Sequence, residues 1–220
     1  MKHIFFSILT ALAFLHCQEP PQTPKNTLSC YVRFDAAGRN VKAEATIRDG
    51  TTKQIVEMPG GIRFQSTEMR ILPVRGITYS IEFPARYTPE VIFDWKNKQG
   101  EKSELKLSAP AIDSFFFDTM VLSTKTATNL QWVGRPLDKG ETLVFMWENT
   151  AEGRTVPMEV STTLGAPLIE LPAAKLAQVG AGNWSLYLVR KRLVKTEVSN
   201  FLVETTAEYY TKPIKVKIEG

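Results

Sequence analysis

Histidine and cysteine, the side chains on which many catalytic sites depend, are scarce. The chain has 220 residues but only two histidines, His3 and His16, and two cysteines, Cys17 and Cys30. Ser-His-Asp and Cys-His catalysis, and histidine-ligated metal sites, each need a histidine held rigidly beside its partner. Both histidines precede the body of the chain, so we expect no catalytic residues, no metal and no cofactor.

Other features are absent too. Two cysteines cannot form a disulfide-dense scaffold, and 13 Gly with 13 Pro are too few for a collagen-like or low-complexity chain. The net charge is +4 and the basic residues are not clustered, so the charge pattern does not indicate a nucleic-acid-binding surface. The composition is 43% hydrophobic and 23% charged, which is ordinary for a globular protein and excludes disorder as the main state.

The first segment has the pattern of an export signal. Lys2 precedes an apolar run from Ile4 to Leu15 that only Ser7 and Thr10 interrupt. Such a run is too short for a membrane-spanning helix, which needs about 20 residues, and fits the apolar core of a signal peptide. We therefore predict that residues 1–16 form a signal peptide and that the body of the chain is exported.

Cys17 follows this run, and Gln18-Glu19-Pro20-Pro21 comes next. This arrangement resembles a bacterial lipoprotein signal, in which the cysteine becomes the lipidated first residue. The resemblance implies a lipid anchor on Cys17, a Pro-rich tether over residues 17–26 and attachment to the outer membrane. The alternative is cleavage after Ala11-Leu12-Ala13, which leaves a periplasmic or secreted protein with a free Cys17.

Beyond the tether, apolar residues recur at every second position in short segments. Val41 to Ile47 alternates apolar and polar residues, and Asp49-Gly50 then marks a hairpin turn. Cys30 lies on the apolar face of the segment Leu28–Phe34, so we expect a small buried side chain there. Short strands at this spacing are typical of a β-sandwich or a β-barrel.

The strand pattern restarts after Ser108-Ala109-Pro110, which is the clearest internal boundary. We predict an all-β fold with two tandem β-sandwiches, domain 1 over residues 27–109 and domain 2 over residues 110–220. One short helix is expected between Pro172 and Gly180. A strand from Trp184 to Val189 should follow the helix, and Arg190-Lys191-Arg192 should mark a solvated hairpin end.

The segment from Leu171 to Arg190 combines a helical turn, Gly180-Ala181-Gly182 and an aromatic-rich strand. It resembles the turn before strand F in immunoglobulin-like and fibronectin type III domains. The resemblance implies an immunoglobulin-like sandwich, with Tyr187 as a corner tyrosine. Because architecture alone does not specify function, the surface residues must supply the functional hypotheses.

Several residues could contact a ligand. Trp95 and Trp132 could stack on sugars, although core packing is the default for tryptophan in alternating segments. If one residue of the pair Tyr209-Tyr210 is buried, the other must face outward. Arg63 and Arg70 belong to a basic stretch that could form an anionic-ligand face or an ordinary solvated sheet face.

These observations leave three hypotheses. The first is a non-catalytic envelope lipoprotein whose two sandwiches dock another protein in assembly, adhesion or scaffolding. The alternative is a glycan-binding surface lipoprotein of a polysaccharide-uptake system, which requires a row of exposed aromatics on one sheet. The third, an enzyme or its accessory domain, requires acid pairs such as Asp113 with Asp118, or Glu148 with Glu152, to converge in a cleft.

Overall fold

The computed structural model describes residues 25–73, 76–97, 99–108, 110–160 and 165–220. The expected signal peptide and residues 17–24 of the expected tether, including Cys17, lie outside these ranges. The last tether residue, Asn26, is instead the first residue of β1. Within the ranges the chain forms strands joined by turns and one helix. The strands of the first half are β1 (Asn26–Asp35), β2 (Asn40–Arg48), β3 (Ile55–Val56), β4 (Ile62–Phe64), β5 (Thr67–Glu68), β6 (Arg70–Leu72), β7 (Thr78–Pro84), β8 (Glu90–Lys96) and β9 (Lys102–Ser108).

The remaining elements begin after the expected boundary. They are β10 (Ser114–Phe117), β11 (Val121–Ser123), β12 (Thr128–Val133), β13 (Glu141–Asn149), β14 (Arg154–Val160), β15 (Leu168–Leu171), α1 (Ala173–Val179), β16 (Gly182–Val198), β17 (Phe201–Tyr210) and β18 (Ile214–Glu219). The predicted all-β class with two tandem β-sandwiches is confirmed. No helix in the described ranges is long and apolar enough to span a membrane.

The first sandwich packs two sheets because its strands alternate in hydrophobicity. One sheet contains β6, β7, β2, β1 and β17, and the other contains β5, β4, β8 and β9. In β1 every second residue is buried, which turns Leu28, Cys30 and Val32 towards the second sheet. Phe93 and Trp95 on β8 are buried from the other side.

The second sandwich has an immunoglobulin-like arrangement of strands. A three-stranded sheet, β10-β12-β15, packs against β14, β13, β16, β18 and β11. Phe145 and Trp147 on β13 are 0% exposed, and the Trp147 ring stacks on Phe117 of β10 with centroids 6.2 Å apart. The core therefore forms between inward faces of both sheets, as the alternating sequence predicts.

Helix α1 confirms the sequence prediction between Pro172 and Gly180. Leu176 and Val179 lie on one face of the helix and are fully buried. Gly180 ends the helix with φ of 94°, a conformation that glycine adopts readily. Trp184 donates a hydrogen bond from Nε1 to the carbonyl of Gly180 at 3.0 Å, which ties the helix end to β16.

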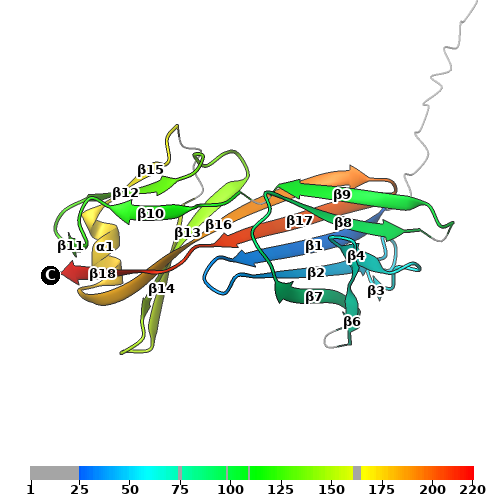
Figure 1. The fold of residues 1–220 in the computed structure, drawn as a ribbon, viewed down its shortest axis with the longest axis horizontal. Coiled ribbons are helices and arrows are strands. Elements are labelled where there is room, and N and C mark those ends of the chain that lie inside the picture. The colour runs from blue at the N-terminus through cyan, green and yellow to red at the C-terminus, as the bar shows by residue number, and fades with distance from the viewer. Residues whose placement is uncertain (1–24, 74–75, 98, 109, 161–164) are drawn as a thin grey trace, which may run out of the picture.

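The two sandwiches share β16, which runs on for 17 residues (Figure 1). Its first part pairs with β18 and β13, and its last part, residues 189–198, pairs with β17. Strand β17 then pairs in parallel with β1 along its whole length, from Asn26↔Phe201 to Asp35↔Tyr210. Residues 189–210 thus form a long hairpin that supplies two strands to the sheet of the first sandwich.

This hairpin changes two expectations. Residues 189–210, which we assigned to domain 2, belong to the sheet of the first sandwich: residues 201–210 pair with β1, and residues 189–198 pair with β17 because the strand continues beyond Val189. The expected turn at Arg190-Lys191-Arg192 is wrong for the same reason. The chain reverses instead at Ser199-Asn200, where Ser199 has φ of 55°.

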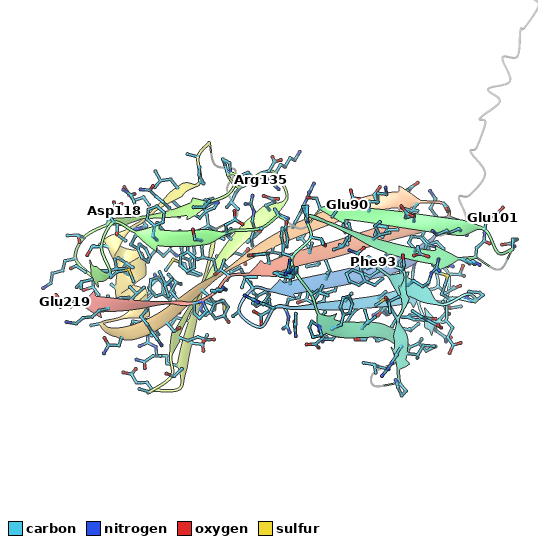
Figure 2. All side chains as sticks on the ribbon, viewed as in Figure 1. Glu90, Phe93, Glu101, Asp118, Arg135 and Glu219 are labelled. Carbon is cyan, nitrogen blue, oxygen red and sulfur yellow. The ribbon has the colours of Figure 1, made fainter. Side chains whose placement is uncertain are left out.

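Figure 1 shows an elongated molecule with the two sandwiches in a row and the C-terminus at the far end of the second. Strand β1 begins at the opposite end, because Asn26 pairs with Phe201 beside the 199–200 turn. In Figure 2, Arg135 and Glu90 lie on the two sides of the junction, whereas Glu101 and Glu219 mark the two far ends.

A buried ion cluster stabilises the junction. Arg190 of β16 is 0% exposed, and its Nη2 lies 2.6 Å from Oε2 of Glu141, which is 2% exposed. Arg190 also donates to the carbonyls of Arg135 and Pro136, at 2.9 and 2.6 Å. The Arg135 guanidinium bonds the same carboxylate from the solvent side. Burial raises the pKa of Glu141, but hydrogen bonds from the two guanidinium groups outweigh it, so the pKa lies below its ordinary value.

Candidate binding surface

Trp95 and Trp132, the two tryptophans proposed to contact a sugar, lie inside the molecule. They are 1% and 3% exposed, because the alternation of β8 and β12 turns them towards the core. Trp132 also donates a hydrogen bond from Nε1 to the carbonyl of Arg135, at 3.0 Å. Neither ring can stack on an external ligand in this structure, so core packing, the default reading, is correct for both.

Tyr209 and Tyr210 face opposite sides of β17. Tyr209 is 6% exposed, and its ring stacks on Phe34 with centroids 5.4 Å apart. Tyr210 is half-buried on the outer face of the sheet. The sequence argument that one of the pair must face outward holds, and Tyr210 is the outward residue.

Arg63 and Arg70 do not form one anionic-ligand face. Arg63 lies on β4 and bonds the carboxylate of Asp94, a residue that is 3% exposed. Arg70 lies in the other sheet, on the edge strand β6, and is exposed. The Arg63 side chain is still 41% exposed, but its charge is already paired with a buried acid, so only Arg70 keeps a charge available to an anionic ligand.

Cys30 behaves as a small core residue. It is 3% exposed, and burial raises the pKa of its thiol well above the usual range. A thiol that stays protonated is a poor nucleophile and a poor metal ligand. No cluster of three metal-ligating side chains occurs among the described residues.

The large sheet that runs through both sandwiches, which we call the shared sheet, has an outer face that points away from the cores. Three side chains stack on this face, and we call them the Tyr–Arg stack: Arg33, Tyr210 and Tyr187. The guanidinium carbon of Arg33 lies 5.5 Å from the centroid of the Tyr210 ring. The Tyr210 and Tyr187 rings stack with centroids 6.1 Å apart and an interplanar angle of 25°. Since β1, β17 and β16 each supply one member, the stack follows the sheet from the first sandwich towards the second.

Hydrogen bonds to Glu208 orient the side chains of Tyr31 and Tyr210 at the Tyr–Arg stack. The hydroxyls of Tyr31 and Tyr210 both donate to Oε2 of Glu208, at 2.8 and 3.1 Å. Partial burial is the main cause that raises the pKa of Tyr31 and Tyr210, and the Glu208 carboxylate adds to it. Burial and the charge of Glu148 raise the pKa of Tyr187 to about 12. All three phenols therefore stay neutral hydrogen-bond donors at neutral pH.

A groove of about 340 Å³ adjoins the stack on the same sheet. Tyr31, Glu44, Leu193, Lys195, Glu204 and Thr206 are among its lining residues. Leu193 is 54% exposed, the highest value among the exposed large hydrophobic side chains of the described residues. The surface thus combines an exposed aliphatic side chain, phenols and charges of both signs.

The stack presents ring edges and hydroxyl groups rather than open ring faces. One face of Tyr210 packs on Tyr187, and the Arg33 guanidinium lies over the ring as well. Sugar stacking requires an open aromatic face, so these rings make a poor platform for it. Tyr and Arg are instead enriched in protein–protein interfaces and at their energetically dominant positions.

Sequence reasoning identified Tyr210 but missed Arg33, Tyr31 and Tyr187. The alternation of residues 28–34 already places Tyr31 and Arg33 opposite the buried Leu28, Cys30 and Val32. Tyr187 was assigned to a corner from a resemblance, whereas its ring packs against Tyr210. The pairing of β17 with β1 brings Tyr31 and Arg33 to Tyr210, and the pairing of β17 with β16 brings Tyr187 there; no local pattern encodes the first of these pairings.

Comparisons with known proteins return structural similarities alone. No family model and no curated protein matches this chain. Similar solved structures include murine CEACAM1b, at 9% identity and a TM-score of 0.27, covering 87% of this chain and 100% of that one. Chicken CNTN1 FN1–FN3 domains share 9% identity, cover 89% of this chain and 66% of that one, and give a TM-score of 0.27.

The fibronectin(III)-like modules of Clostridium thermocellum CbhA also resemble this chain. They share 12% identity, with a TM-score of 0.23, and the match covers 88% of this chain and 94% of that one. At such TM-scores and identities these similarities assign neither a family nor a function.

Proposed function

We propose that this chain is a non-catalytic cell-envelope protein, anchored by a lipid on Cys17, that uses its two sandwiches to bind another protein. The observation that supports this proposal best is the Tyr–Arg stack with its adjoining groove. The stack is half-buried, preorganised by stacking and hydrogen bonds, and built from residue types that dominate protein interfaces. Because β16 crosses the junction, the two sandwiches present this surface on one continuous sheet.

The geometry of the chain ends fits an anchored protein. Asn26, where β1 begins, lies at the end of the molecule remote from the second sandwich (Figure 1). An anchor on Cys17 would hold that end near the membrane and direct the second sandwich away from it. The binding face along β1, β17 and β16 would then run between the two ends and meet a partner from the side.

The glycan-binding alternative has less support. It requires exposed aromatic faces, but Trp95 and Trp132 are buried and the Tyr187 and Tyr210 rings cover one another. The enzyme hypothesis requires paired carboxylates in a cleft. Glu148 and Glu152 both line an open groove of about 330 Å³, but the Glu148 carboxylate also lies beside the Tyr187 hydroxyl, on the face that we assign to partner binding.

The test begins with photo-crosslinking on living cells that express the full-length chain, followed by identification of the captured protein. Its affinity is then measured for the wild type, for Tyr187→Ala with Tyr210→Ala, and for Phe116→Ala. Phe116 is a matched control, because it is a 45% exposed aromatic residue on the outer face of the three-stranded sheet.

We expect the double Tyr variant to bind at least about 30-fold more weakly, the loss of about 2 kcal/mol typical of an interface hot spot, and Phe116→Ala to bind normally. If Phe116→Ala alone lost binding, the interface would lie on the three-stranded sheet, and the assignment to the Tyr–Arg stack would be wrong. Intact mass of the membrane-extracted protein tests the anchor separately, since an unmodified Cys17 would refute it.

A further inference from the structure

The interior of the first sandwich contains a pocket separate from the Tyr–Arg stack. It has a volume of about 170 Å³ and lies between the two sheets, near the ends of β2 and β7 that face the junction. Two aromatic pairs contribute to its walls. Phe34 packs edge-on against Tyr87 at 5.3 Å, and Phe64 packs against Phe83 at 6.3 Å. Val32, Val41 and Val91 complete the apolar lining.

This volume is unusual for a protein core. Interiors are close-packed, and the few voids that exist seldom exceed the size of a water molecule. An engineered apolar cavity of about 150 Å³ stays free of water and binds benzene. The pocket here is of similar size and similar chemistry, so it has room for about six carbon atoms.

Polar groups border the pocket on one side. Arg86 is exposed on the loop between β7 and β8, and Gln65 and Thr88 also line the pocket. Arg86 forms no ion pair with an acid in the described part of the chain. Glu208 also borders the pocket, but one of its carboxylate oxygens already accepts hydrogen bonds from Tyr31 and Tyr210.

We propose that this pocket binds a short-chain carboxylate of about six carbons. The hydrocarbon chain lies between the Phe34–Tyr87 and Phe64–Phe83 walls, and the carboxylate lies at the mouth, where it pairs with Arg86. Burial of the chain supplies most of the affinity, and the guanidinium selects an anion over a neutral molecule of the same shape. The pocket is smaller than a drug-sized site, which restricts the ligand to a small molecule.

The experiment titrates hexanoate into protein purified from cells that express the full-length chain, and compares hexanamide as a neutral ligand of the same shape. Nuclear magnetic resonance follows the methyl groups of Val32, Val41 and Val91. The variants are Ala85→Leu, which fills the pocket from its lining, and Arg86→Gln, which removes the charge. Ala37→Leu, in the exposed turn after β1, is the control for Ala85→Leu.

We expect hexanoate to shift the three valine methyls and to bind at least about tenfold more tightly than hexanamide. Ala85→Leu should abolish binding with no loss of melting temperature, Arg86→Gln should remove the preference for the anion, and Ala37→Leu should change neither. Equal affinity for both ligands would overturn the role of Arg86. Unshifted valine methyls in the wild type would overturn the pocket itself, whatever the variants do.

Discussion

The ion cluster at the junction allows a quantitative prediction for Glu141→Gln. The substitution keeps the size of the side chain but removes the charge that pairs with Arg190, which is 0% exposed. An unpaired charge in a buried position costs about 3–5 kcal/mol. We therefore expect the free energy of unfolding at pH 7 to fall by about that amount.

Urea denaturation of the full-length chain measures this loss, and two further variants identify its cause. Arg135→Gln removes a guanidinium that is 43% exposed, so its cost should stay below about 1 kcal/mol. Replacing both buried partners, Glu141→Leu with Arg190→Leu, leaves no unpaired charge and should recover most of the stability. A loss below about 1 kcal/mol for Glu141→Gln, or a double variant as unstable as the single one, would refute the reasoning.

The same cluster predicts a pH dependence. The pKa of Glu141 lies below its ordinary value in the folded protein, so its contribution to stability is complete above the pKa of the unfolded chain. The contribution is lost as the pH falls through the lower, folded value. The stability difference between wild type and Glu141→Gln should thus be constant near neutral pH and shrink below about pH 4.5, the ordinary value for a glutamate. A difference that persists unchanged at pH 3 would contradict this assignment.

Further predictions concern the shared sheet and the core. A fragment of residues 25–109 should lack cooperative unfolding by circular dichroism, because it loses the β17 partner of β1; a sharp melt would argue against that dependence. Ile47→Asp and Phe145→Asp, at 2% and 0% exposure, should each abolish the single melting transition of the whole chain, whereas loss of only half the signal would show that the sandwiches unfold independently. Trp147→Ala should cost about 3–5 kcal/mol in urea denaturation, and a cost below 1 kcal/mol would mean that its site is not tightly packed. Ultraviolet titration should find the midpoint of Tyr187 ionisation near pH 12, and a midpoint near 10 would place its ring in solvent.

Local sequence patterns were sufficient for the class of the fold. Alternation in Val41–Ile47 predicted a half-buried strand, and β2 has that burial pattern. The helix before Gly180 was also predicted, because its apolar spacing and its glycine stop signal lie within a few residues of each other. These features depend on neighbours in sequence, so a single chain reveals them.

The shared hairpin depends on distant residues and was missed. Nothing near Leu28 indicates that Val203 will be its parallel partner, and a basic run at Arg190 looks like solvated surface until its buried acid is known. The Tyr–Arg stack follows from the same pairing. The sequence also could not decide whether Trp95 and Trp132 are buried or exposed. Their neighbours in the alternating segments are only partly polar, so the pattern does not show which face of each strand points inward.

Both the continuous sheet that joins the two sandwiches and the proposed binding face depend on the parallel pairing of β1 with β17, and a cross-strand disulfide tests this pairing directly. Ser29 and Glu204 are register partners on the outer face, so Ser29→Cys with Glu204→Cys brings two thiols within bonding range. Ser29→Cys with Glu208→Cys, displaced by four residues on β17, is the matched control. After mild oxidation, mass spectrometry of peptides should find the 29–204 crosslink and no 29–208 crosslink. Equal yields for both pairs, or no 29–204 crosslink at all, would contradict the account.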